Sequence, residues 1–234
     1  MPLDFMPGFW ALVTEREEMH SRIESSLKEK KVLLQEIHHR VKNNLQIISS
    51  LLNLQTRSSD DAGAVQALRD SQMRIRSMAL IHEKLYQSPS LASIDFGEYV
   101  KSLTTDLFRT YRGYASGIQL DIKADQVFLN LDHAVSCGLI LNELMTNALK
   151  YAFPDGGNGT IRVELQSLPE QMLALCVADD GVGIPSDFDI FNTKSLGLQL
   201  VHNLVRQLDA ALEVETHSGT SFAIYFRYQR EGAL

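Results

Sequence analysis

Two adjacent histidines, His38 and His39, stand in LLQEIHHRVKNNLQ (33–46), a stretch that also carries arginine, lysine and asparagine. A neutral imidazole nitrogen is a nucleophile near neutral pH, and nearby cations can steady phosphate oxygens. Apolar residues at three- and four-residue spacing predict a helix here, on which His39 lies about 170° from the centre of the apolar stripe. His39 is therefore expected to face solvent, while His38 borders the stripe. A histidine pair also fits an ordinary exposed surface, so the rest of the chain decides its interpretation.

A second group of polar residues lies in LNELMTNALKYAF (141–153). Residues three or four apart on a helix are neighbours, so its polar members share adjacent faces of an otherwise apolar helix. They suit a metal nucleotide: an amide oxygen for a hard Mg²⁺ ion, an ammonium group for phosphate, and a carboxylate to act as a base or to orient a metal-bound water. The residues are Asn147, Lys150 and Glu143 in that order, with Tyr151 beside them.

An acid and two glycines follow a predicted strand in VADDGVGIP (177–185). Asp179, at the strand end, can accept a hydrogen bond from an exocyclic amine such as that of adenine. Gly181 and Gly183 let the backbone approach a flat ring closely. A motif of this kind also occurs in simple tight turns. It indicates a nucleotide site only because it occurs in order with the other motifs.

The stretch KSLGLQLV (194–201) places Gly197 at a predicted helix start, and Gly219-Thr220 opens the last strand. Free backbone N–H groups and the helix dipole favour phosphates at such a helix start. The chain has no G-x-x-x-x-G-K-[ST] sequence, so a P-loop is excluded as the phosphate-binding element.

Two helical patterns precede these motifs. Residues 14–57 contain no proline or glycine and show a helical apolar seam, a polar break covers 56–63, and a second pattern runs from Val65 to Leu85. One apolar stripe on each helix is poorly buried by a lone hairpin, so we expect two copies to form a four-helix bundle.

The remaining chain mixes helices and strands, with hairpin-linked strands at its end. This order predicts an α+β fold in which the hairpin bundle precedes an α/β sandwich with a mixed, largely antiparallel sheet. We expect helices at 96–111, 132–153 and 196–208, and strands at 118–123, 160–168, 171–178, 211–216 and 221–228.

Composition excludes several classes of function. The 234 residues carry a net charge of −7 and a pI near 5.5, which argues against nucleic acid as a main partner. No apolar run reaches the roughly 18 residues of a membrane span, and the start lacks the basic and apolar regions of a signal peptide. A cytoplasmic location is expected.

The four nucleotide motifs resemble the Bergerat-type (GHKL) ATP-binding domain shared by histidine kinases and type II topoisomerases. NELMTNALKYAF is similar to its N box, DDGVGIP and SLGLQLV to its first two glycine boxes, and GTSFAIYF to its third. Together with EIHHRVKNNLQ, residues 30–228 resemble a sensor histidine kinase whose phosphoacceptor box reads H-R-x-x-N, as in HWE-type kinases and their relatives.

This resemblance implies specific roles. His39 would be the phosphoacceptor and Glu143 a second catalytic residue, Asn147 the Mg²⁺ ligand and Asp179 the adenine contact. The other nucleotide-binding residues would be Lys150, Tyr151, Gly181, Gly183, Gly197, Leu198 and Thr220. Many histidine kinases place an acid directly after the phosphoacceptor, where this chain has Arg40, so Glu36 is our candidate for the proton acceptor.

The resemblance also implies an activity and partners. ATP and Mg²⁺ would serve autophosphorylation of His39, followed by transfer to an aspartate of a response-regulator receiver domain. We expect a homodimer with a possible upstream sensor module, built from an extension or sensor remnant (1–20), a dimerisation and phosphotransfer domain (21–88) and an ATP-binding domain (93–230). The alternatives are a phosphotransfer or scaffold protein with an inactive nucleotide site, and a GHKL serine kinase.

Overall fold

A computed structural model describes residues 6–86, 93–110, 117–154, 157–185, 188–190, 193 and 195–228. The chain divides into two compact units, residues 1–44 and 45–234. This division runs through the first helix, α1 (Met6–Ser58), and does not test the predicted domain boundaries, which stay predictions.

The predicted pair of long helices is present. α1 has 53 residues and begins at Met6, earlier than the seam indicates, and α2 (Ala62–Tyr86) has 25. Asp61 starts α2 by accepting hydrogen bonds at Oδ1 from the backbone N–H groups of Gly63 and Ala64, at 2.8 and 3.2 Å. In the second unit Gln72 Nε2 donates to the carbonyl of Ser49 at 3.2 Å, which joins α2 to the end of α1.

The apolar stripe of α1 is largely open to solvent in the single chain. Ile37, Ile48 and Leu51 are 51%, 44% and 56% exposed. Contiguous exposed apolar surface of this kind commonly marks an interaction site. No helix in the described ranges is both long enough and apolar enough to cross a bilayer.

The second unit contains a five-stranded sheet of order β2-β4-β5-β7-β6. β2 pairs parallel with β4, and the other three pairings are antiparallel. The expected mixed, largely antiparallel sheet is therefore confirmed. The strands are β2 (Ile118–Ala124), β4 (Gly159–Leu168), β5 (Met172–Asp179), β6 (Ala211–Glu215) and β7 (Thr220–Arg227).

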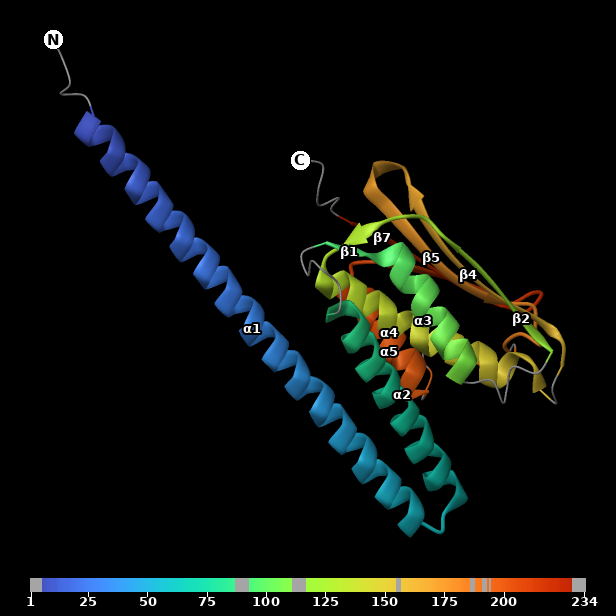
Figure 1. Cartoon of the computed structure of the whole chain (residues 1–234). Helices are drawn as coiled ribbons and strands as arrows, with labels where there is room; N and C mark the ends of the chain where they lie inside the picture. The colour runs from blue at the N-terminus through green and yellow to red at the C-terminus, as the bar shows by residue number, and fades with distance from the viewer. Residues whose placement is uncertain are drawn as a thin grey trace. The chain divides into compact units, whose positions relative to one another are not determined.

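Three helices cover one face of this sheet (Figure 1): α3 (Phe96–Thr110), α4 (Leu131–Asn147) and α5 (Leu196–Gln207). α4 lies at the centre, and its Ile140 and Leu141 are fully buried. Alternate residues of β4, β5 and β7 face these helices, as the period of two in a strand requires. Asn130 caps α4 by accepting from the backbone N–H of His133 at 2.9 Å.

Three features refine the predicted elements or add to them. The helix expected over 132–153 is α-helical only to Asn147 and continues as a π-helical turn, η1 (Ala148–Ala152). A short antiparallel pair joins β1 (Ile94–Asp95) to β3 (Phe128–Leu129). The link from β4 to β5 is a single 3₁₀ turn, η3 (Pro169–Gln171). Single π turns are rare and frequently occur at functional sites, and this one lies inside the predicted N box.

Candidate functional site

A cavity of about 490 Å³ opens between α4, η1, the ends of β5 and β7, and the start of α5. Its wall is mostly apolar with a few polar groups, which is the usual character of a small-molecule site. The polar lining residues are Asn147, Asp179, Ser195 and Thr220, and the apolar ones include Leu144, Ala148, Tyr151, Val177, Ile184, Phe188, Leu198 and Phe222.

Asp179 is held rigidly at the end of β5. Its Oδ1 accepts hydrogen bonds from the backbone N–H groups of Gly181, at 3.0 Å, and Thr220, at 3.2 Å. Burial raises the pKa of Asp179 above its ordinary value, although the two backbone hydrogen bonds and Thr220 act in the opposite direction. Two backbone donors thus fix one oxygen of the carboxylate at the cavity wall.

Glycines allow the backbone to pass close to this carboxylate. A Cβ on Gly219, which has a φ of 93°, would stand 1.9 Å from the carbonyl oxygen of Asp179. A Cβ on Gly181 would stand 2.2 Å from the carbonyl oxygen of Ala152, and Gly183 has a φ of 75°. At position 219 the positive φ and the close approach to the Asp179 carbonyl both require a residue without a Cβ. Glycines therefore determine the path of the backbone around the cavity.

Asn147 and Tyr151 project from the end of α4 and from η1 into the same cavity wall. Tyr151 is 64% exposed, so its ring is available to cover a bound molecule. Asn147 is half-buried, and among the described residues no group hydrogen-bonds to its side-chain amide. An unpaired amide oxygen at the cavity edge fits a Mg²⁺ ligand.

α5 begins beside the cavity. Ser195 and Leu198 line it, whereas the buried Gly197 faces α4. A Cβ on Gly197 would lie 2.4 Å from Oε2 of Glu143 and 3.0 Å from a guanidinium nitrogen of Arg74. The small residue therefore lets a carboxylate and a guanidinium group approach the first turn of α5.

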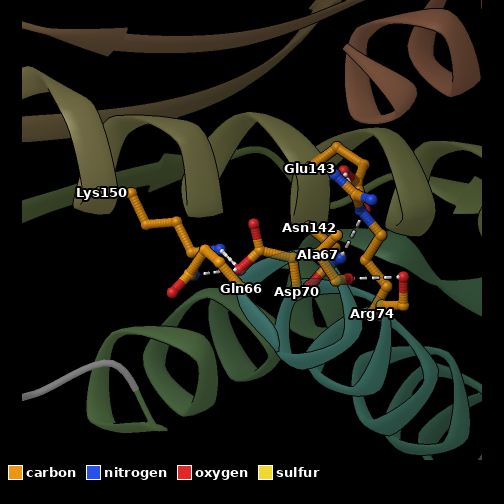
Figure 2. A network of polar contacts seen from close by, with 8 residues as sticks. Gln66, Ala67, Asp70, Arg74, Asn142, Glu143 and Lys150 are labelled. Atoms are coloured by element: carbon orange, nitrogen blue, oxygen red, sulfur yellow. Dashed lines mark hydrogen bonds and ion pairs between the residues drawn. The ribbon is translucent and has the colours of Figure 1, made fainter. Parts of the chain in front are cut away.

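Glu143 and Lys150 do not line the cavity and turn instead toward α2 (Figure 2). Arg74 Nε donates to both carboxylate oxygens of Glu143, at 2.9 and 3.1 Å. Lys150 Nζ donates to Oδ1 of Asp70 at 2.7 Å. Sequence spacing placed these two charges on the nucleotide side with Asn147, and the structure places them in ion pairs with another helix.

The structure thus gathers six of the predicted nucleotide residues at one cavity: Asn147, Tyr151, Asp179, Gly183, Leu198 and Thr220. Sequence reasoning missed Phe188, Ser195 and the apolar wall of α4 and η1. Phe188 lies in an aperiodic loop that gives no pattern to read. Ala148 could have been predicted as a cavity residue, because it directly follows Asn147 in the sequence.

In the first unit, His39 lies within α1, but its side chain falls outside the part of the structure that is described. Its solvent-facing orientation stays a prediction. The next residue, Arg40, donates from Nε to Oε1 of Glu36, one helical turn earlier, at 2.9 Å, and both side chains are exposed. The segment 89–92 between the two predicted domains also falls outside the described residues.

Comparison with known proteins decides what these two regions are. A family model described as histidine kinase matches residues 36–111. A second, described as histidine kinase-, DNA gyrase B-, and HSP90-like ATPase, matches residues 133–230. The chain carries the core of a histidine kinase. The first match covers the C-terminal part of α1 from residue 36, all of α2, and α3, and the second match covers the cavity.

Named relatives agree. The kinase core is 32% identical over 233 residues to the sensor histidine kinase PdtaS of Mycobacterium tuberculosis, covering 97% of this chain and 45% of that protein. It is 32% identical to blue-light-activated histidine kinase 2 of Erythrobacter litoralis, covering 80% and 54%. The solved Erythrobacter litoralis EL346 blue-light activated histidine kinase superposes with a TM-score of 0.65 at 28% identity, over 85% of this chain and 59% of that one. The chain spans about half the length of these named relatives.

Proposed function

We propose that the chain binds Mg-ATP in the cavity, phosphorylates its own His39, and passes the phosphoryl group to an aspartate of a response-regulator receiver domain. The observation that carries this proposal is the position of Asp179, a backbone-anchored carboxylate in an apolar cavity, in a chain that also has a histidine on a long helix. The domain boundaries at 21–88 and 93–230 belong to the same proposal.

The apolar cavity suits a flat purine. Asp179 would accept a hydrogen bond from the exocyclic amine of adenine, with Tyr151 over the base or ribose. A guanine ring presents a carbonyl oxygen at that position, which a carboxylate repels. This pairing favours ATP over GTP.

The phosphates would extend toward the first turn of α5, where backbone N–H groups and the helix dipole favour anions. Asn147 would hold Mg²⁺, assisted by Glu143 through a bound water, and Lys150 would offset the phosphate charge. Bound Mg²⁺ neutralises charge on the transferring group; orienting the nucleotide and excluding water fall to the residues of the cavity.

In the transfer step a ring nitrogen of His39 forms a bond to the γ-phosphorus, the bond to the bridging oxygen breaks, and ADP leaves. The imidazole loses one proton as the N–P bond forms, and Glu36 is the proposed acceptor. Arg40 Nε donates to Oε1 of that carboxylate at 2.9 Å, so the proton would be accepted at Oε2.

The partners follow from this chemistry. The exposed apolar stripe of α1 supports a homodimer, in which two hairpins bury their stripes together. Phosphohistidine requires an acceptor, for which a receiver aspartate is proposed. ATP as the substrate favours a cytoplasmic location, and the N-terminal part of α1 is the proposed connection to a sensor module.

The test is incubation of the full chain with γ-labelled ATP, followed by acid and base treatment. Label that is lost in acid, retained in base, and absent from His39→Gln supports the proposal. His38→Gln is the matched control and should retain the label. Undiminished labelling of His39→Gln would instead favour a serine kinase. Nucleotide binding without any label would favour a scaffold or phosphotransfer protein.

A further inference from the structure

We infer that α2 restrains the nucleotide site through a charge latch, made by Asp70 and Arg74 of α2 with Lys150 and Glu143 of the N-box segment, and that Mg-ATP must open this latch. The inference rests on the proposed function and adds a regulatory device to the same site. It concerns two ion pairs that lie wholly within the second compact unit.

The latch is short and shielded from water. The Lys150–Asp70 pair measures 2.7 Å, with side chains 10% and 21% exposed. The Arg74–Glu143 pair measures 2.9 Å, with side chains 22% and 2% exposed. Ion pairs on an open surface contribute little, but partly buried pairs are screened much less by solvent and salt. The two ion pairs therefore stabilise the packing of α2 against α4.

Secondary contacts extend the latch on both sides (Figure 2). Gln66 Nε2 donates to Oδ1 of Asp70 at 2.9 Å, the same oxygen that accepts the hydrogen bond from Lys150. Asn142 Nδ2 donates to Oε1 of Glu143 at 3.3 Å. The two carboxylates are thus oriented by neutral neighbours as well as by their cations.

The latch uses the two α4-side charges that the proposed reaction needs. Glu143 has both oxygens engaged by Arg74 and turns away from the cavity, so in this arrangement it is not placed to orient a metal-bound water. An ammonium group paired with Asp70 has less charge to offer phosphate. Neither Asp70 nor Arg74 lines the cavity, which argues against their acting directly on the nucleotide. The arrangement is therefore competitive: α2 and Mg-ATP draw on the same two side chains.

Competition of this kind is reciprocal. If the latch lowers the affinity for Mg-ATP, bound Mg-ATP weakens the latch by the same factor. The helix that follows the histidine helix would in this way be released when the site fills. Typical coupling between two such sites changes affinity by about five-fold or more.

The experiment compares the full chain with the double variant Asp70→Asn, Arg74→Gln. We expect it to bind Mg-ATP about five-fold more tightly and to incorporate label into His39 faster by a similar factor. Arg69→Gln is the matched control, because Arg69 is exposed on the same helix and makes no ion pair with the described residues; it should match wild type. A thermal unfolding curve establishes that the double variant is folded.

A second measurement needs no variant. Addition of Mg²⁺ with a non-hydrolysable ATP analogue should accelerate amide hydrogen exchange around residues 70–74 of the wild-type chain, while exchange in β6 and β7 should not accelerate. Unchanged affinity in the double variant together with unchanged exchange would overturn the latch. Slower labelling at unchanged affinity would also overturn it, and would make Arg74 a residue that positions Glu143. Absence of Mg-ATP binding in wild type would instead refute the proposed function.

Discussion

Asp179 Oδ1 accepts a hydrogen bond at 3.2 Å from the backbone N–H of Thr220, a residue 41 positions later in the chain. This contact ties the end of β5 to the start of β7 at the cavity wall. Because Oδ1 is also bonded to the N–H of Gly181, the carboxylate has a fixed orientation. A fixed hydrogen-bond acceptor in an apolar cavity favours ligands that carry a hydrogen-bond donor at the matching position over ligands that lack one.

Asp179→Asn should therefore lose nucleotide affinity selectively. The amide oxygen can still accept from the two backbone N–H groups, but the NH₂ group would face the amine of adenine. We expect a loss of at least about tenfold in ATP affinity, and a smaller preference for ATP over GTP, by calorimetric titration. Asp180→Asn is the control, because Asp180 Oδ1 accepts from Thr160 N–H at 2.6 Å and does not line the main cavity. Equal losses in both variants would contradict the role of Asp179.

Gly219→Ala should destabilise the ATP-binding unit. The new methyl group would meet the carbonyl oxygen of Asp179, at a φ of 93° that side-chain-bearing residues rarely adopt. We expect a reduction of about 2–4 kcal/mol in the free energy of unfolding, measured by urea titration. Gly157→Ala, where the nearest atom lies 3.7 Å away, should stay within about 0.5 kcal/mol of wild type. A stable Gly219→Ala chain would show that the strand end can move.

Stability should depend on pH through Glu143. Burial raises its pKa above the ordinary 4.5, despite opposing contributions from Arg74, Lys150 and Asn142. A raised pKa means that the folded chain binds the proton more tightly than the unfolded chain, so this group stabilises the fold at low pH and loses that contribution as pH rises through the folded pKa. Relative to Glu143→Gln, wild type should gain stability as pH falls from neutral through the raised pKa toward 4.5. A pH-independent difference in unfolding free energy would contradict the direction of the shift.

The exposed stripe of α1 should hold two copies together. Charges at Ile48 and Leu51, introduced as Ile48→Glu with Leu51→Glu, would be buried without partners in a dimer interface. We expect the variant to be monomeric by light scattering after size-exclusion chromatography. Ser50→Glu adds a charge at an exposed position of the same helix and should leave a dimer intact. A dimeric double variant would place the interface elsewhere.

The sequence predicted the helices and strands in which apolar residues recur at a regular spacing. The strands at 160–168 and 171–178 and the helix at 196–208 lie within one or two residues of β4, β5 and α5. It also predicted six of the cavity residues, because their motifs occur at the ends of these elements. Two-residue strands such as β1 are too short to show a period.

The positions of Glu143 and Lys150 could not be predicted. Helical spacing predicts that Glu143 and Lys150 lie on the same broad face as Asn147. It does not predict which other elements pack against each part of that face. Their partners are 69 and 80 residues distant in sequence. The π turn at Ala148–Ala152 also changes the direction in which successive side chains point, and no residue pattern in this stretch predicts a π turn.

The strand order β2-β4-β5-β7-β6 has a consequence for biosynthesis. β7 is the last of these five strands in chain order, yet it inserts between β5 and β6 and supplies the N–H group that anchors Asp179. A nascent chain on the ribosome therefore lacks one wall of the cavity until β7 has emerged. The proposed nucleotide binding therefore requires a complete sheet, and bound nucleotide would favour the finished fold over intermediates that lack β7.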